Sequence, residues 1–278
     1  MDYSQNIHEV TPHTLMFQSD NSNAGAIILP NSIVAIDPTM YPPDARGFRT
    51  EIEKKYNKKV KFLLITHYHG DHVFGAGPFK EVERVAHESQ IELIDERLNG
   101  EWSKEALEEW KNEEPERAEA IDQIEILKPT VTFESEFIIS DEENSDRVEI
   151  YHTGGHTKDS SFAYFPKEKV VFTGDLIFAE SFPWACDKTC NPDDWILAFE
   201  KILSLDFAYV IPGHGPLTGR EEMEKHLNLF KELRKIIKES IENGIKAEDI
   251  KMPDFYPPIQ PEMDIRSIEH WIKFYSDK

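Results

Sequence analysis

Four side chains that can bind metal ions stand within six positions, in the sequence Thr-His-Tyr-His-Gly-Asp-His. They are His67, His69, Asp71 and His72, and they directly follow the apolar run KVKFLLIT, which is typical of a buried strand. In an extended backbone, residues two apart point to the same side, so His67 and His69 can bind one ion. Gly70 permits a sharp turn, after which Asp71 and His72 can face a second ion. The spacing predicts a metal site at the end of a strand.

Three more residues of the same types each follow a glycine directly. They are His156 in TGGHT, Asp175 in FTGDL and His214 in IPGHG, and the last two also follow predicted strands. A set of unrelated structural histidines would not fall repeatedly at such positions. Imidazole and carboxylate ligands suit zinc, and they also suit iron or manganese. We expect zinc.

The succession HxHxDH, GH, GD and PGHG resembles the metallo-β-lactamase superfamily, from about residue 10 to about residue 220. The resemblance implies an α+β fold, a four-layer αββα sandwich with the ligands at one edge. It also implies a first ion on His67, His69 and His156, a second ion on Asp71, His72 and His214, and Asp175 as the bridge between them.

Two metal ions held in this way predict a hydrolase. A water bound between ions about 3.5–4 Å apart loses its proton near neutral pH, and the hydroxide attacks a carbonyl or phosphoryl centre. Asp71 can orient that hydroxide and carry a proton, so it is the predicted catalytic residue. The expected substrate is a small acyl compound, and the sequence does not choose among ester, thioester, lactone and lactam. Because dedicated secreted β-lactamases generally lack the bridging aspartate, the resemblance does not favour antibiotic hydrolysis as the main activity.

Three alternatives remain open: a phosphodiesterase or nuclease of the same fold, a persulfide dioxygenase with one iron, and a binding module without turnover. The 53 acidic and 31 basic residues give a formal charge of −22, which repels nucleic acids and anionic lipids. We therefore expect neither nucleic acid nor membrane as a partner. A metal count would separate the dioxygenase from a two-zinc hydrolase, and the presence of all seven ligands argues against a binding module.

Hydrophobic patterning indicates the elements that carry these residues. Apolar runs at 24–30 and 32–37 predict a hairpin, residues 42–56 a helix, and residues 89–126 an acidic helical insertion. Alternating runs at 130–140, 147–155, 160–166 and 169–178 predict an antiparallel meander. Asn191 can cap a helix that extends to about residue 203, and a long amphipathic helix is expected at 221–242. We expect one domain at 1–242, with a Pro-rich strap and a short helix at 243–278 packed on it.

The surroundings of the site are predicted less sharply. The loop from Phe178 to Cys190, with its aromatic residues Phe182 and Trp184, should bound a partly apolar pocket. The insertion either covers this pocket or is simply anchored to the body by Trp102 and Trp110. Four hydroxyl residues beside the ligands can bond either to them or to local backbone: Thr66, Thr157, Ser160 and Thr173. For His87 and His152 we expect ordinary core or surface positions.

The two cysteines, Cys186 and Cys190, are too few for a disulfide framework. No apolar run approaches the roughly 18–20 residues that a membrane span needs, and the first residues show no leader pattern. These features predict a cytoplasmic protein, and they do not indicate an oligomeric state.

Overall fold

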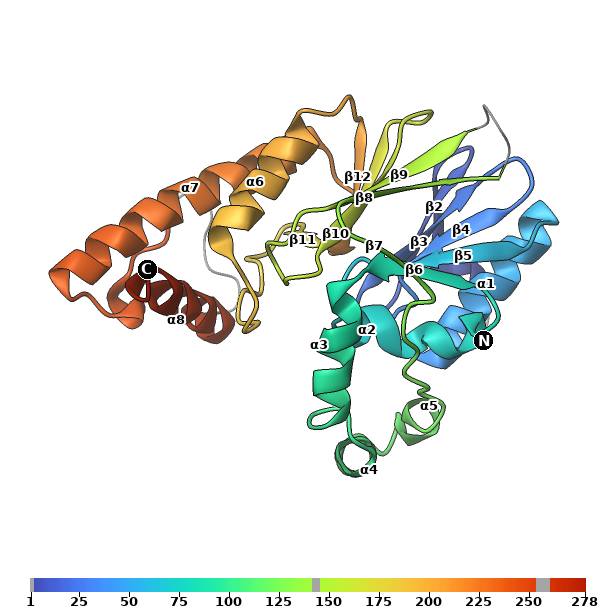
Figure 1. Cartoon of the computed structure of the whole chain (residues 1–278), viewed down its shortest axis with the longest axis horizontal. Coiled ribbons are helices and arrows are strands. Elements are labelled where there is room, and N and C mark those ends of the chain that lie inside the picture. The colour runs from blue at the N-terminus through green and yellow to red at the C-terminus, as the bar shows by residue number, and fades with distance from the viewer. Residues whose placement is uncertain (1–2, 142–145, 254–260) are drawn as a thin grey trace.

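Two mixed β-sheets pack face to face at the centre of the structure (Figure 1). The computed structural model describes residues 3–141, 146–253 and 261–278. The seven-stranded sheet has the order β1 (Ile7–Thr11), β2 (Thr14–Gln18), β3 (Asn23–Ile28), β4 (Ile33–Ile36), β5 (Val60–Leu64), β6 (Glu83–His87) and β7 (Val131–Phe133). Its first four strands are antiparallel, and β4 to β7 run parallel.

The five-stranded sheet contains β12 (Tyr209–His214), β11 (Val170–Phe178), β10 (Ser161–Phe165), β9 (Arg147–His152) and β8 (Glu136–Ser140), in that order. Strands β8 to β11 are antiparallel, and β12 pairs with β11 in parallel. Apolar side chains from both sheets meet between them, among them Ile27 and Leu64 from the first sheet and Ile150 and Phe172 from the second. This buried layer holds the two sheets together.

Helices cover the outer face of each sheet. Beside the first sheet lie η1 (Ser4–Asn6), α1 (Pro42–Tyr56), α2 (Gly70–Val73), η2 (Phe74–Phe79), α3 (Ser89–Leu98), α4 (Lys104–Glu113) and α5 (Ala118–Ile121). Beside the second lie α6 (Pro192–Leu203), α7 (Arg220–Asn243), η3 (Ala247–Asp249) and α8 (Pro261–Ser276). The predicted four-layer αββα sandwich is therefore confirmed. None of the helices formed by the described residues is long and apolar enough to cross a membrane.

Local signals placed several helices correctly. Helix α1 covers the predicted residues, and the Asn191 side chain accepts hydrogen bonds from the backbone N–H groups of Asp193 and Asp194 at the start of α6. Helix α7 exceeds its prediction by one residue at each end, and Gly244 follows it with a φ of +65°. The cap at Asn191 fixes where α6 begins, directly beyond the loop from Phe178 to Cys190.

Two predictions about elements were wrong in detail. The run 130–140 is not one strand of a meander, because β7 pairs with β6 in the first sheet and β8 with β9 in the second. The insertion is helical only in three short pieces, and no helix covers residues 122–126. Strands β1 and β2 precede the first run for which bounds were predicted. The predicted strap at 252–263 lies mainly outside the described residues, and the division at residue 242 stays a prediction.

Candidate metal centre

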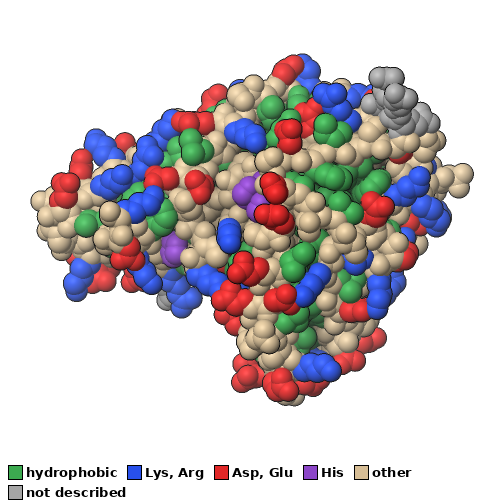
Figure 2. Space-filling model, in the orientation of Figure 1, with side chains coloured by type: hydrophobic (Ala, Val, Ile, Leu, Met, Phe, Trp, Pro, Cys, Tyr) green, Lys and Arg blue, Asp and Glu red, His purple; other side chains and the backbone are tan. Residues whose placement is uncertain are grey.

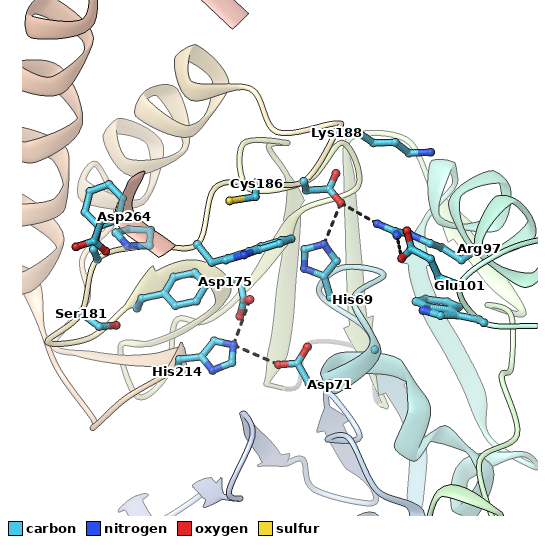
Figure 3. Close-up of a pocket in the computed structure, with 17 residues that line it drawn as sticks. His69, Asp71, Arg97, Glu101, Asp175, Ser181, Cys186, Lys188, His214 and Asp264 are labelled. Atoms are coloured by element: carbon cyan, nitrogen blue, oxygen red, sulfur yellow. Dashed lines mark hydrogen bonds and ion pairs between the residues drawn. The ribbon is translucent and has the colours of Figure 1, made fainter. Parts of the chain in front are cut away.

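All seven predicted ligands lie together at one edge of the two sheets. Figure 3 shows four of them, His69, Asp71, Asp175 and His214, where they line a pocket. His67 and His69 follow β5, and Asp71 and His72 lie in α2, which begins at Gly70. The other three come from the second half of the chain: His156 from the loop after β9, Asp175 from β11 and His214 from the end of β12. Both sheets therefore contribute to the centre.

The first group consists of His67, His69, His156 and Asp175, and one possible ligand atom from each lies within 4.8 Å of the others. Nδ1 of His69 is 3.1 Å from Nε2 of His67 and 2.9 Å from Nε2 of His156. Oδ2 of Asp175 is 3.6 Å from the first of those Nε2 atoms and 3.4 Å from the second. Three imidazoles and one carboxylate thus converge on a single point, as in a tetrahedral site.

The second group consists of Asp71, His72 and His214. Nε2 of His214 lies 3.3 Å from Oδ2 of Asp71, and Nε2 of His72 lies 3.5 Å from the same oxygen. Asp175 also reaches this group, because its Oδ1 is 3.0 Å from Nε2 of His72 and its Oδ2 is 3.2 Å from Nε2 of His214. The Asp175 carboxylate therefore faces both groups.

Buried atoms and charges in the centre fit a bound cation. Nε2 of His72 and Oδ1 of Asp175 are buried and make no hydrogen bond with the described residues. Burial opposes ionisation of Asp175, but His214, His72 and His67 together hold its pKa well below the ordinary value. Burial likewise opposes a charge on His214, yet Asp175 and Asp71 raise its pKa to about 10. The ionised carboxylates of Asp71 and Asp175 are stabilised by positive charge beside them, and a bound metal ion can supply that charge in place of protonated histidine.

Asp37, which the sequence analysis missed, positions two of the ligands. Its carboxylate lies 2.8 Å from Nδ1 of His72 and accepts hydrogen bonds from the backbone N–H and the hydroxyl of Thr66. The Thr66 hydroxyl lies 3.1 Å from Nδ1 of His67. Each histidine thus turns Nε2 toward the centre and its other nitrogen toward this buried network. Asp37 has a φ of +53°, an uncommon angle for a residue other than glycine.

Asp187, also missed, positions His69. It is buried, and its Oδ2 lies 3.1 Å from Nε2 of His69 and accepts hydrogen bonds from Tyr68 and Arg97. Burial opposes its ionisation, but the bonds from His69, Thr189 and Tyr68 hold its pKa below the ordinary value. With Nε2 committed to this carboxylate, His69 faces the centre through Nδ1.

The remaining hydroxyl residues make different contacts. Thr157 and Ser160 bond to each other and to Asp159 or local backbone, and Thr173 bonds only to backbone carbonyls. Of the four, Thr66 is the one that contacts a predicted ligand. His87 and His152 do not join the centre; their rings stack with centroids 3.6 Å apart.

Two glycines make the close packing of the centre possible. A Cβ atom at Gly213 would lie 2.0 Å from Oδ1 of Asp175, and one at Gly174 would lie 2.4 Å from the Thr66 hydroxyl. Gly174 also has a φ of +50°, which disfavours other residues. A glycine directly before Asp175 and another before His214 are therefore required by space.

A pocket of about 810 Å³ opens onto the centre. Its lining includes Phe178, Phe182 and Trp184 from the predicted loop and Trp102 from the insertion, so both predicted walls are present. The Trp184 ring stands edge-on to His69 with centroids 5.2 Å apart, and the Phe178 ring stacks on His214 at 4.8 Å. Trp102 also packs against Phe74, so it anchors the insertion and lines the pocket.

A model of the Metallo-beta-lactamase superfamily matches residues 19–214, which include all seven predicted ligands. The chain belongs to this superfamily. The family and the His/Asp clusters together indicate the use of divalent metal. Which ion each residue binds stays a prediction.

Individual members of the superfamily are only distantly similar to the chain. It is 24% identical over 192 residues to the Beta-lactamase-like protein 2 homolog of Caenorhabditis elegans, covering 66% of this chain and 54% of that protein. It is 25% identical over 208 residues to the 2,4-dinitroanisole O-demethylase subunit alpha of a Nocardioides strain, covering 71% and 54%. The chain therefore spans about half the length of these relatives. The structure of a sec-alkylsulfatase from a Pseudomonas species matches 97% of this chain and 50% of its own, with a TM-score of 0.76 and 15% identity.

Proposed function

We propose that this chain is a dinuclear metal-dependent hydrolase that cleaves small acyl compounds. The observation that carries the proposal is the position of the Asp175 carboxylate, which lies near imidazoles of both groups: its Oδ1 faces His72, and its Oδ2 faces His214, His67 and His156. One carboxylate facing two sets of imidazoles is the arrangement expected for a bridge between two ions.

The proposed centre fits two zinc ions, although iron or manganese would accept the same ligands. When bound, the ions supply a deprotonated water as nucleophile and polarise the carbonyl under attack. Asp71 lines the pocket, and its Oδ2 lies between His72 and His214, so it can orient the attacking water and take up its proton. Trp184 and Phe182 offer an apolar wall on which the rest of the substrate can pack.

The primary test is metal analysis combined with a substrate panel. We expect two zinc equivalents per chain, and hydrolysis of esters, thioesters or lactones that a chelator abolishes and added zinc restores. The panel should include an alkyl sulfate and a nitroaryl methyl ether, because one relative is named an alkylsulfatase and another a 2,4-dinitroanisole O-demethylase subunit. If the protein hydrolyses the alkyl sulfate or demethylates the ether but cleaves no acyl compound, the proposal of acyl hydrolysis is rejected. If it contains one iron ion per chain and oxidises a persulfide, it is a dioxygenase instead.

Variants of the second group test the proposed assignment of ligands. Asp71→Ala and His214→Ala should each lose about one metal equivalent and lower kcat at least 100-fold, because charge stabilisation and nucleophile positioning fail together. Metal content by mass spectrometry and kcat on the best ester are the measurements. Wild-type turnover at full metal load in either variant would contradict the assignment.

We also propose that nucleic acids are not substrates. Figure 2 shows Asp and Glu side chains gathered at the lower end of the lobe that carries α4 and α5. A nucleic-acid surface needs several cationic side chains that displace counterions from the phosphates. Metal-dependent cleavage of RNA at moderate salt would overturn this statement.

A further inference from the structure

Two basic side chains line one end of the pocket. Arg97 comes from α3 in the insertion, and Lys188 comes from the loop between β11 and α6. Figure 3 shows both at the end of the pocket next to His69, away from Ser181 and Asp264. In a chain with a net charge of −22, two cations beside a metal centre indicate a local requirement for positive charge.

The guanidinium of Arg97 has two buried partners and one exposed, replaceable partner. Nη2 donates to Tyr68 and to Asp187, both buried, so this edge belongs to the network that positions His69. Nη1 is paired with Glu101, whose side chain is 73% exposed. An ion pair with so exposed a carboxylate contributes little to stability, because solvent screens it. A carboxylate on a ligand in the pocket can therefore replace Glu101 at little cost.

Lys188 is similarly placed. Its ammonium pairs with Glu96 of α3, and the two side chains are 49% and 58% exposed. The Asp187 carboxylate accepts from Nη2 of Arg97 and is also bonded to His69, Tyr68 and Thr189, so Nη1 of Arg97 and the Lys188 ammonium are the groups that an anionic ligand would meet. Glu101, which lines the pocket beside both cations, thus occupies a position that an anionic ligand would take.

We propose that Arg97 and Lys188 form a subsite for an anionic group, so that the preferred acyl substrates carry a carboxylate several bonds away from the scissile carbonyl. The proposal rests on the proposed acyl hydrolysis. Asp187 lies between Arg97 and His69, so an anion on Arg97 lies beyond a carbonyl held at the first group. The aromatic residues Trp102 and Trp184 line the same pocket and can contact the apolar chain that joins the two groups.

The test compares two p-nitrophenyl esters with acyl chains of equal length, the half-ester of adipic acid and the hexanoate. We define the anion preference as the ratio of their kcat/KM values, corrected for hydrolysis without protein. Because general damage to the metal centre slows both esters, the ratio isolates the subsite. The wild-type protein should prefer the adipate ester.

Three variants make the test specific. Glu101→Gln should raise the anion preference about threefold, because it removes the competing carboxylate, and Lys188→Gln should lower it by a similar factor. Arg97→Gln should abolish the preference, and Glu101→Gln should have no further effect in that background. A preference unchanged by Glu101→Gln, or raised equally with and without Arg97, would overturn the proposal.

Failure of the subsite is distinguishable from failure of the proposed reaction. If neither ester is hydrolysed, calorimetry with adipate and hexanoate on the zinc-loaded protein decides the matter. Each acid has a carboxylate for the metals, and only adipate has a second one. Tighter adipate binding that increases further in Glu101→Gln would support the subsite, and equal affinities for the two acids would reject it.

Discussion

His69 uses both of its ring nitrogens, one toward the first group and one toward Asp187. This division of roles fixes the tautomer and the orientation of the ring. Partners of this kind commonly contribute about 10- to 100-fold to metal affinity. Asp187 is therefore expected to act on the metal through His69, without touching substrate.

We predict that Asp187→Ala weakens zinc binding at the first group about 10- to 100-fold, while Asp187→Asn, which keeps an acceptor oxygen, loses less. Competition with a chromophoric chelator measures the affinity. The matched control is Glu101→Gln, which removes a carboxylate from the same arginine without touching His69. Equal losses of affinity in Asp187→Ala and Glu101→Gln would show that charge near Arg97, and not orientation of His69, is what matters.

At the scale of residues, sequence reasoning identified the side chains that face the centre and missed those behind them. His67 and His214 lie in motifs whose spacing can be recognised in the sequence without any knowledge of the fold. Asp37 ends the predicted run 32–37, and Asp187 lies between the two cysteines. Their roles depend on packing against α2 and α3, which no local pattern encodes.

The strand β12 illustrates how an element positions the centre. It pairs with β11 in parallel, and the pairing becomes irregular from Gly174 onward, where Asp175 and His214 approach each other. The backbone of Gly213 fills the space beside the Asp175 carboxylate, so a side chain there would push Asp175 away from both groups.

Gly213→Ala should consequently reduce metal content and lower kcat at least tenfold, although the added methyl group changes neither charge nor ligand number. Gly77→Ala is the control, since the atoms nearest to its added Cβ would lie 3.9 Å away. Metal analysis and circular dichroism on both variants provide the measurement. A fully loaded, active Gly213→Ala protein would contradict the proposed spatial requirement.

Element prediction succeeded where one local signal dominates and failed where tertiary pairing decides. The cap at Asn191 and the first-turn acids of α6 are local, and the helix begins where they indicate. The run 130–140 carries a strand pattern throughout, yet its two halves enter different sheets. Which sheet a strand joins depends on partners distant in the sequence, and alternation of apolar residues does not contain that information.

At the scale of the whole molecule, a stacked pair of histidines is one of the contacts between the two sheets. His87 belongs to β6 and His152 to β9, and their stacked rings are nearly parallel, with an angle of 12°. Burial, and then the neighbouring His152, lower the pKa of His87 to about 4. The folded protein thus keeps His87 neutral at a pH where the unfolded chain protonates it.

This difference predicts a loss of stability in mild acid. The contribution of His87 to the free energy of unfolding is complete above the pKa of about 6.5 that this residue has in the unfolded chain. It falls as the pH decreases, because the unfolded state gains the proton first, and it levels off near pH 4. The loss across this window should be roughly 2–3 kcal/mol. Urea unfolding of the chelator-treated protein at several pH values should show a shallower pH dependence for His87→Gln than for the wild type. His8→Gln, at an exposed histidine, should retain the wild-type slope, and identical slopes for all three would exclude His87 as the cause.

The distribution of ligands over both sheets also sets an order of assembly. His67, His69, Asp71 and His72 leave the ribosome together, whereas His156, Asp175 and His214 follow only after the insertion and most of the second sheet have been synthesised. During that interval a nascent chain offers an ion the predicted ligands of the first sheet without the Asp175 carboxylate. Tight metal uptake must therefore wait for β11 and β12, which makes loading of the centre one of the last steps in the maturation of the protein.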